Sequence, residues 1–84
     1  MQILKFGGSS VENAENINRV AGIIKKASRK DKTIVVVSAM GGITDSLLKT
    51  AVTAAAADKS YLGMLEDIEN RHINVIHSIL PVKH

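Results

Sequence analysis

The run Thr33–Val37, with the sequence TIVVV, constrains the possible folds more than any other stretch of the chain. Every residue in it is β-branched, and apolar residues follow one another without polar residues between them. Side chains of this kind favour strands, and a strand without alternation is typical of a parallel sheet covered on both faces. The run therefore predicts a buried strand in an α/β domain.

The sequence around this strand predicts the element order β-α-β-α-α. We expect a first strand at Gln2–Phe6 and a helix at Glu12–Lys30, where apolar residues recur at helical spacing. After the second strand, we expect one helix from Thr44 to about Ala57 and another over Tyr61–Leu80, which ends before a proline. Two strands joined by a helix form one right-handed βαβ unit.

The length of the chain limits what this unit can be by itself. The 84 residues allow one small domain at most. Two strands are too few for a stable buried sheet, which normally has about four to six. We therefore expect residues 1–84 to be the N-terminal portion of a larger α/β domain, incomplete as given.

Four polar side chains have competing interpretations. Ser9 and Asn13 are both plausible caps for the first long helix. Thr44 suits the cap of the next helix, although its hydroxyl also follows a glycine-rich loop. His72 lies in the apolar stripe of the last helix, so we expect a packed, hydrogen-bonded histidine and no metal ligand. The residues expected in this stripe are Leu65, Ile68, His72, Val75 and Ile79.

Composition narrows the range of partners. The net charge is +3, and several basic residues cluster where the first helix should end, which suits the helix dipole. Aromatic residues that could stack on bases are missing there, so we expect no nucleic-acid partner. No apolar run approaches the roughly 20 residues that span a membrane, and we see no signal peptide. The lack of cysteine excludes disulfides and fits the cytoplasmic location that we expect.

Each expected strand ends in a loop with paired glycines, Gly7-Gly8 and Gly41-Gly42, and each loop leads into a helix. Adjacent parallel strands would place both loops at the edge of the sheet where ligands bind. Glycine lets the backbone approach a ligand closely, and free N–H groups at a helix start attract anions. One such pair is explained equally well by a tight turn, whereas two pairs favour a phosphate or carboxylate site. The Walker A and dinucleotide-binding patterns are absent, because Lys5 precedes the glycines.

Two stretches resemble a known family. Lys5–Val11, KFGGSSV, resembles the K-F-G-G-[TS]-S-V signature of aspartate kinases (aspartokinases), and Val37–Asp45, VSAMGGITD, resembles their V-S-A-x-x-G-I-T-[DN] element. The resemblance implies the first part of a catalytic domain with the parallel-sheet sandwich of amino-acid kinases. It also implies transfer of the ATP γ-phosphoryl group to the side-chain carboxylate of L-aspartate. This reaction is the first step of lysine, threonine and methionine biosynthesis.

The resemblance implies a role for each loop. Lys5 would hold the transferring phosphate, the hydroxyls of Ser38 and Thr44 would bind aspartate, and Mg²⁺ would bridge the nucleotide phosphates. The residues expected at the site are Lys5, Phe6, Gly7, Gly8 and Ser9 for ATP, and Ser38, Gly41, Gly42 and Thr44 for aspartate.

Other parts of the family's machinery are not found in these residues. The groups that bind the substrate amine and carboxylate, and the pocket for the nucleotide base, would lie further along a longer chain. We therefore expect residues 1–84 alone to be inactive and to self-associate, and the parent enzyme to be a homo-oligomer. Two alternatives stay open: an amino-acid-kinase-fold enzyme with another acceptor, and an interaction module without catalysis.

Overall fold

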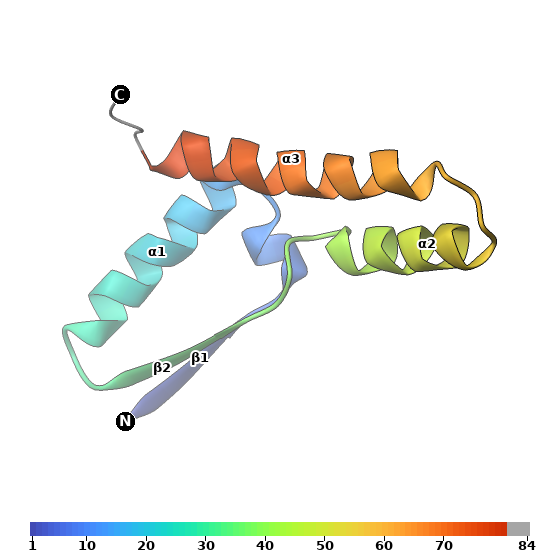
Figure 1. The fold of residues 1–84 in the computed structure, drawn as a ribbon. Coiled ribbons are helices and arrows are strands. Elements are labelled where there is room, and N and C mark those ends of the chain that lie inside the picture. The colour runs from blue at the N-terminus through green and yellow to red at the C-terminus, as the bar shows by residue number, and fades with distance from the viewer. Residues whose placement is uncertain (81–84) are drawn as a thin grey trace. The chain divides into compact units, whose positions relative to one another are not determined.

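A computed structural model describes residues 1–80 of the protein (Figure 1). The elements are β1 (Gln2–Phe6), the 3₁₀ helix η1 (Gly8–Val11), α1 (Ala14–Ser28), β2 (Thr33–Val37), α2 (Ile43–Ala55) and α3 (Tyr61–Ile79). They form two compact units, one over Met1–Gly41 and one that begins at Gly42. Both strands have the expected bounds, and the predicted α/β class and order of long elements are confirmed.

The first unit is built on a parallel pair of strands. β1 and β2 align with Gln2 beside Thr33 and Phe6 beside Val37. The crossover helix α1 contacts β2, and the Gln2 side chain donates a hydrogen bond of 2.9 Å to the carbonyl of Ala27 in α1. Val20 of α1 is 7% exposed and belongs to the small core. Gln2 therefore marks the face of the sheet that α1 covers.

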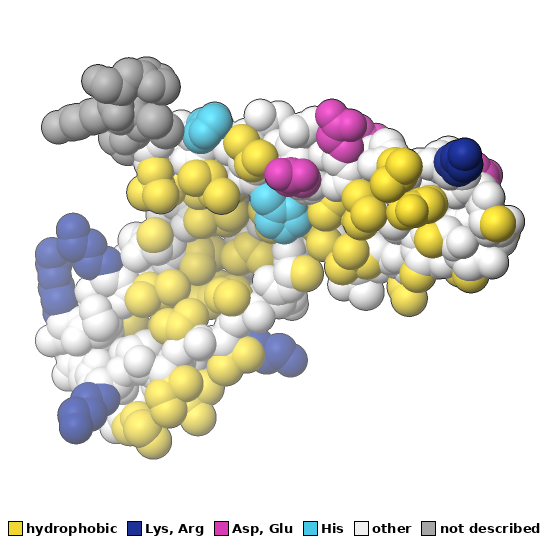
Figure 2. Space-filling view, viewed as in Figure 1, with side chains coloured by type: hydrophobic (Ala, Val, Ile, Leu, Met, Phe, Trp, Pro, Cys, Tyr) yellow, Lys and Arg dark blue, Asp and Glu magenta, His cyan; other side chains and the backbone are white. Residues whose placement is uncertain are grey.

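The opposite face of the sheet is open within the part of the chain that the structure describes. Ile3, Ile34 and Val36 are 46–65% exposed, although all three are large apolar residues. Figure 2 shows hydrophobic side chains gathered over this part of the first unit. The β-branched run was predicted to be covered on both faces, and residues 1–80 do not supply the second cover.

Helix α1 is shorter than predicted at both ends. Asn13 has extended backbone angles, and its side chain accepts a hydrogen bond of 2.8 Å from the amide of Asn16. Asn13 is therefore the N-cap, and the alternative cap at Ser9 is wrong. Glu12 belongs to the turn that follows η1, because the extended residue 13 separates that turn from the helix.

The second unit consists of α2 and α3, which pack against each other. The helix α2 begins one residue earlier than predicted, and its N-cap is Gly42, whose φ of +84° lies in the left-handed region. The predicted cap at Thr44 is wrong, because Thr44 already lies inside the first turn. The helix ends at Ala55, and Asp58 then accepts a hydrogen bond of 2.9 Å from the amide of Ser60, within the predicted break.

Helix α2 buries one apolar and one hydroxyl residue and leaves larger apolar residues exposed. Ile43 and Thr50 are 4% and 5% exposed, whereas three apolar residues of the same helix, Leu47, Leu48 and Val52, are 48–70% exposed. The buried hydroxyl of Thr50 donates to the carbonyl of Ser46 at 2.7 Å, so its burial leaves no unsatisfied donor. The covered face of α2 therefore combines an apolar and a hydroxyl residue, while Leu47, Leu48 and Val52 are exposed.

The predicted stripe of α3 is largely confirmed. Ile68, His72, Val75 and Ile79 are half-buried, but Leu65 is exposed. His72 was expected to be packed and hydrogen-bonded, and its Nδ1 lies 2.7 Å from the carbonyl oxygen of Ile68. None of the helices in residues 1–80 combines the length and the apolar character that crossing a membrane requires.

Candidate functional site

Both glycine loops start at the same end of the sheet, as the sequence predicted. Phe6 and Val37 are register partners at the ends of their strands, and the amide of Ser38 donates a hydrogen bond of 3.0 Å to the carbonyl of Phe6. The parallel pairing therefore extends to the first residue of the second loop. It places Gly7 and Ser38 beside each other at the carboxyl edge of the strands.

The first loop is held by short-range hydrogen bonds. Gly7 is extended, and its carbonyl accepts a hydrogen bond of 3.1 Å from the amide of Ser10, which closes the 3₁₀ turn. The carbonyl of Ser9 accepts a hydrogen bond of 3.1 Å from the side chain of Asn16 in α1. Val11, at the end of the turn, is 7% exposed. The backbone of the loop is thus fixed at both ends while the Ser9 side chain stays exposed.

The two loops touch through glycine backbone. A β-carbon at position 8 would lie 3.3 Å from the carbonyl oxygen of Ala39 and 3.4 Å from the α-carbon of Gly41. Only a residue without a side chain allows this approach without displacing the neighbouring backbone. The structure therefore brings Gly8, predicted to bind phosphate, against Gly41, predicted to bind the acceptor.

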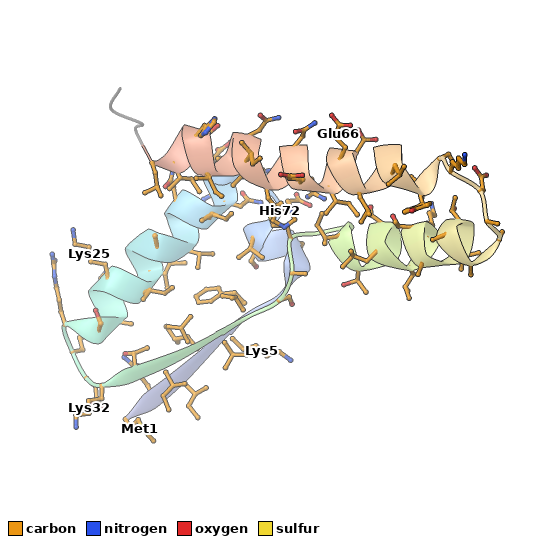
Figure 3. All side chains as sticks on the ribbon, viewed as in Figure 1. Met1, Lys5, Lys25, Lys32, Glu66 and His72 are labelled. Atoms are coloured by element: carbon orange, nitrogen blue, oxygen red, sulfur yellow. The ribbon has the colours of Figure 1, made fainter. Side chains whose placement is uncertain are left out.

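Lys5 lies on the open face of the sheet. It is exposed, it sits opposite Val36 in the register, and Figure 3 shows its side chain projecting away from the strands. Within residues 1–80 its ammonium group forms no ion pair or hydrogen bond. The charge is therefore available to a ligand, although the structure shows no contact between it and the glycine loops.

The two hydroxyls predicted to bind substrate are both exposed. Ser38 belongs to the first unit, and its backbone amide extends the strand pairing while its side chain stays free of hydrogen bonds to the described residues. Thr44 belongs to the second unit, in the first turn of α2, and its hydroxyl caps nothing there. The amide of Ser46 is the first that bonds back into the helix, so the preceding amides of that turn lack helical partners.

A family model for the amino acid kinase family matches residues 1–79, which include both loops and all the helices. The protein belongs to the amino acid kinase family.

Proteins named as aspartokinases are similar to this chain over most of its length. The chain is 36% identical to aspartokinase 2, chloroplastic, of Arabidopsis thaliana over 80 residues. This match covers 92% of the chain and 14% of the relative. The chain is 32% identical over 76 residues to the bifunctional aspartokinase/homoserine dehydrogenase 1, chloroplastic, of Zea mays, covering 90% and 8%. It is 49% identical over 47 residues to an aspartokinase of Rickettsia felis, covering 55% and 12%. The chain thus spans less than a sixth of the length of these relatives.

Sequence reasoning missed two residues that lie beside the loops of this chain. Asn16 completes the cap of α1 with its amide and binds the Ser9 carbonyl with its side chain. Arg71 of α3 lies near the start of α2, since a β-carbon at Gly42 would be 3.7 Å from its Nη1. The capping pattern could have indicated Asn16. No spacing rule links Arg71 to a glycine so far away in the sequence.

The first unit also has a polar hollow beside the first loop. The hollow, of about 280 Å³, is lined by Phe6, Ser9 and Ser10 together with α1 residues that include Asn16 and Arg19. Arg19 is 3.4 Å from Glu15 in an exposed ion pair of the i, i+4 kind, which contributes little to stability. Among residues 1–80 no group of three or more histidine, aspartate or glutamate side chains is placed to bind a metal ion.

Proposed function

We propose that this chain is part of an aspartate kinase, which transfers the γ-phosphoryl group of ATP to the side-chain carboxylate of L-aspartate. The observation that carries the proposal is the meeting of the two glycine loops, Gly8 against Gly41, at the carboxyl edge of a parallel strand pair. The identities with proteins named aspartokinase support the choice of acceptor. The product would be 4-phospho-L-aspartate, an intermediate for lysine, threonine and methionine.

The first loop would bind the phosphate groups. Phosphoryl transfer depends mainly on positioning and on neutralising negative charge. Lys5 supplies an exposed ammonium group without an internal partner, and Gly7-Gly8 lets phosphate oxygens approach the backbone. Phe6 and Ser9 flank the glycines and line the hollow on the α1 side of the sheet, so they would contact ATP from the other side of the loop than Lys5.

The second loop would bind the acceptor. The hydroxyls of Ser38 and Thr44 carry no hydrogen bonds to the described residues, so both can be donated to a carboxylate. Gly41 allows the close contact with Gly8, and Gly42 adopts the left-handed conformation that precedes α2. The unpartnered amides in the first turn of α2 favour an anionic ligand nearby.

Mg²⁺ would be held through the nucleotide phosphates, since the described residues contain no acidic cluster of their own. When bound, the ion neutralises phosphate charge and orients the transferring group. The residues of this chain then have to hold the phosphates and the acceptor carboxylate in line.

Residues 1–84 would act only as part of a longer enzyme, because the chain spans 8–14% of the three relatives above. The partners of that enzyme would be ATP, L-aspartate and further copies of itself. The cytoplasmic location stays a prediction.

The test is an acceptor assay with the whole protein. Purified enzyme is given Mg²⁺-ATP and one of several amino acids, including L-aspartate and L-glutamate, and ADP release is measured. Hydroxylamine is added in parallel, since it converts an acyl phosphate into a hydroxamate and so separates carboxyl phosphorylation from ATP hydrolysis. We expect ADP and hydroxamate in equal amounts with L-aspartate alone. If the enzyme turned over only with a different acceptor, the proposal of L-aspartate as the substrate would be wrong, but the family membership would stand.

A further inference from the structure

The contact between Gly8 and Gly41 has a role that neither loop would have alone. We propose that these two glycines are positioning residues, whose mutual contact sets the separation between the phosphate loop and the acceptor loop. The inference rests on the proposed function, because it needs one loop to hold the phosphoryl group and the other to hold its acceptor.

The contact is tight on both sides. A β-carbon at Gly41 would lie 3.2 Å from the carbonyl oxygen of Gly8, and 3.1 Å and 3.2 Å from Cβ and Oε2 of Glu12. A β-carbon at Gly8 would lie 3.3 Å from the carbonyl oxygen of Ala39, and in ordinary contact with Gly41 at 3.4 and 3.6 Å. The contacts shorter than 3.4 Å are tighter than packed side chains normally make, and the carbonyl groups of Gly8 and Ala39 cannot rotate away as a flexible side chain can.

Space, and not backbone conformation, is what requires glycine at these positions. Among the glycines of residues 1–80, only Gly42 has a positive φ. Gly8 and Gly41 have backbone angles that alanine can also adopt, so an added methyl group would be opposed by its neighbours alone. A substitution at either position therefore tests the spacing of the loops directly.

The strand pairing makes this spacing rigid. The hydrogen bond from the Ser38 amide to the Phe6 carbonyl fixes where both loops leave the sheet. Because the strand ends are fixed, a methyl group at position 41 has to displace the parts of the loops that follow them by a few tenths of an ångström. In-line transfer is sensitive to such shifts, since a misplacement of about 1 Å can cost about 100-fold in rate. Each loop would still bind its own ligand.

The experiment compares alanine substitutions in the whole enzyme. We expect Gly41→Ala and Gly8→Ala each to lower kcat by about 10-fold or more, while the KM values for ATP and aspartate change by less than about threefold. The matched control is Gly22→Ala in α1, where a β-carbon would meet nothing within 4 Å among the described residues. This variant should retain the kcat of the natural enzyme, and its melting temperature should not fall, because alanine is the better helix former at this exposed position.

A second-site change separates spacing from a general loss of structure. Two of the three close neighbours of a β-carbon at position 41 belong to Glu12, so Glu12→Gly removes both. We expect Glu12→Gly to restore part of the kcat lost in Gly41→Ala and to restore none of the loss in Gly8→Ala. Glu12→Gly alone is measured to complete the cycle.

The possible results are distinct. Gly8→Ala and Gly41→Ala enzymes with natural kcat, or with a loss confined to one KM, would overturn the positioning role. If Gly41→Ala does not fold, Gly8→Ala alone decides. Should the natural enzyme use an acceptor other than L-aspartate, the proposed substrate fails, and the same variants are compared on that acceptor.

Discussion

The two units of the chain are held together in different ways. In the unit Met1–Gly41, backbone groups make the decisive contacts, through the paired strands, the bond from Ser38 to Phe6 and the approach of Gly8 to Gly41. In the unit that begins at Gly42, two helices meet through side chains, with Ile43 and Thr50 buried between them. The backbone contacts fix where the two loops leave the sheet, whereas the side-chain contacts hold a helix pair together.

The units share one property, which is that each exposes apolar residues. The first leaves Ile34 and Val36 half exposed on the open face of the sheet, and the second leaves Leu48 and Val52 61% and 70% exposed. Val11, Val20 and Ile43 are the buried hydrophobic residues of the described chain. Two small units with so little core gain only modest stability from burial.

The largest effect should appear when residues 1–84 are produced alone. We expect no turnover of ATP and aspartate, since a partial frame cannot position both substrates. We also expect self-association at modest concentration, because the two-stranded sheet exposes an apolar face and both of its edges. Analytical ultracentrifugation, thermal unfolding and an ADP-release assay check these outcomes. A compact monomer with a sharp cooperative melt would contradict the structural part, and measurable ADP release the catalytic part.

The next effect concerns the charge in the first unit. Lys5→Ala in the whole enzyme should lower kcat by about 10²–10³-fold, because removing one donor from a developing charge costs roughly 3–4 kcal/mol. The KM for aspartate should change far less. Lys25→Ala is the control, since Lys25 is exposed in the last turn of α1 (Figure 3). Steady-state kinetics that give Lys5→Ala natural turnover would remove Lys5 from the site.

Sequence reasoning succeeded where the pattern itself determines the structure. The β-branched run and the paired glycines correctly predicted both strands and the placement of both loops at one edge of the sheet. Two adjacent parallel strands necessarily end at the same edge. Sequence reasoning did not identify the covered face of α2, where Ile43 and Thr50 are buried while Leu47 and Leu48 are exposed. Periodicity identifies a helix, but the partner decides which face is covered. The approach of Gly8 to Gly41 joins residues far apart in sequence, so no local pattern contains it.

The second unit offers a sharper test through Thr44. Thr44→Val keeps the shape and removes the hydroxyl, so the KM for aspartate should rise by about 5- to 150-fold, which corresponds to about 1–3 kcal/mol. ATP binding should hardly change. The melting temperature should also stay the same, because Gly42 and not Thr44 caps α2. Loss of stability without a change in KM would mean that the hydroxyl supports the fold and does not bind the acceptor.

The N-cap of α1 is a side chain, whereas that of α2 is a glycine, and loss of the side-chain cap should have a smaller effect than the changes above. Asn13→Ala removes the side chain that accepts from the Asn16 amide, and should lower the free energy of unfolding by about 1 kcal/mol. Asn18→Ala is the matched control, since Asn18 is exposed inside the same helix and alanine is the better helix former there. Chemical denaturation of the whole protein measures both. If both substitutions changed the free energy of unfolding equally, the assignment of Asn13 as the N-cap would be wrong.

The smallest expected effect is on the pH dependence of stability, to which one exposed carboxylate in each unit contributes. The N-terminal ammonium group, 2.7 Å from Asp31, and the amide of Lys32 lower the pKa of Asp31 below its ordinary value of 3.8. Hydrogen bonds from the Ser60 amide and side chain lower the pKa of Asp58 in the same direction. A carboxylate with a lowered pKa stabilises the fold above that ordinary value, and the contribution is lost as the pH falls through the lower value of the folded state.

The partners of these carboxylates predict how the two contributions differ. Acetylation of the N-terminus or 1 M salt should remove most of the contribution of Asp31, because its main partner is an exposed charge. Neither treatment should alter that of Asp58 to the same extent, since its partners are neutral donors. Melting temperatures of the whole protein between about pH 2.5 and pH 5, compared with those of Asp31→Asn and Asp58→Asn, measure both. If acetylation changed the pH dependence of the Asp31→Asn variant as much as that of the natural chain, the ammonium group would not be the partner that matters.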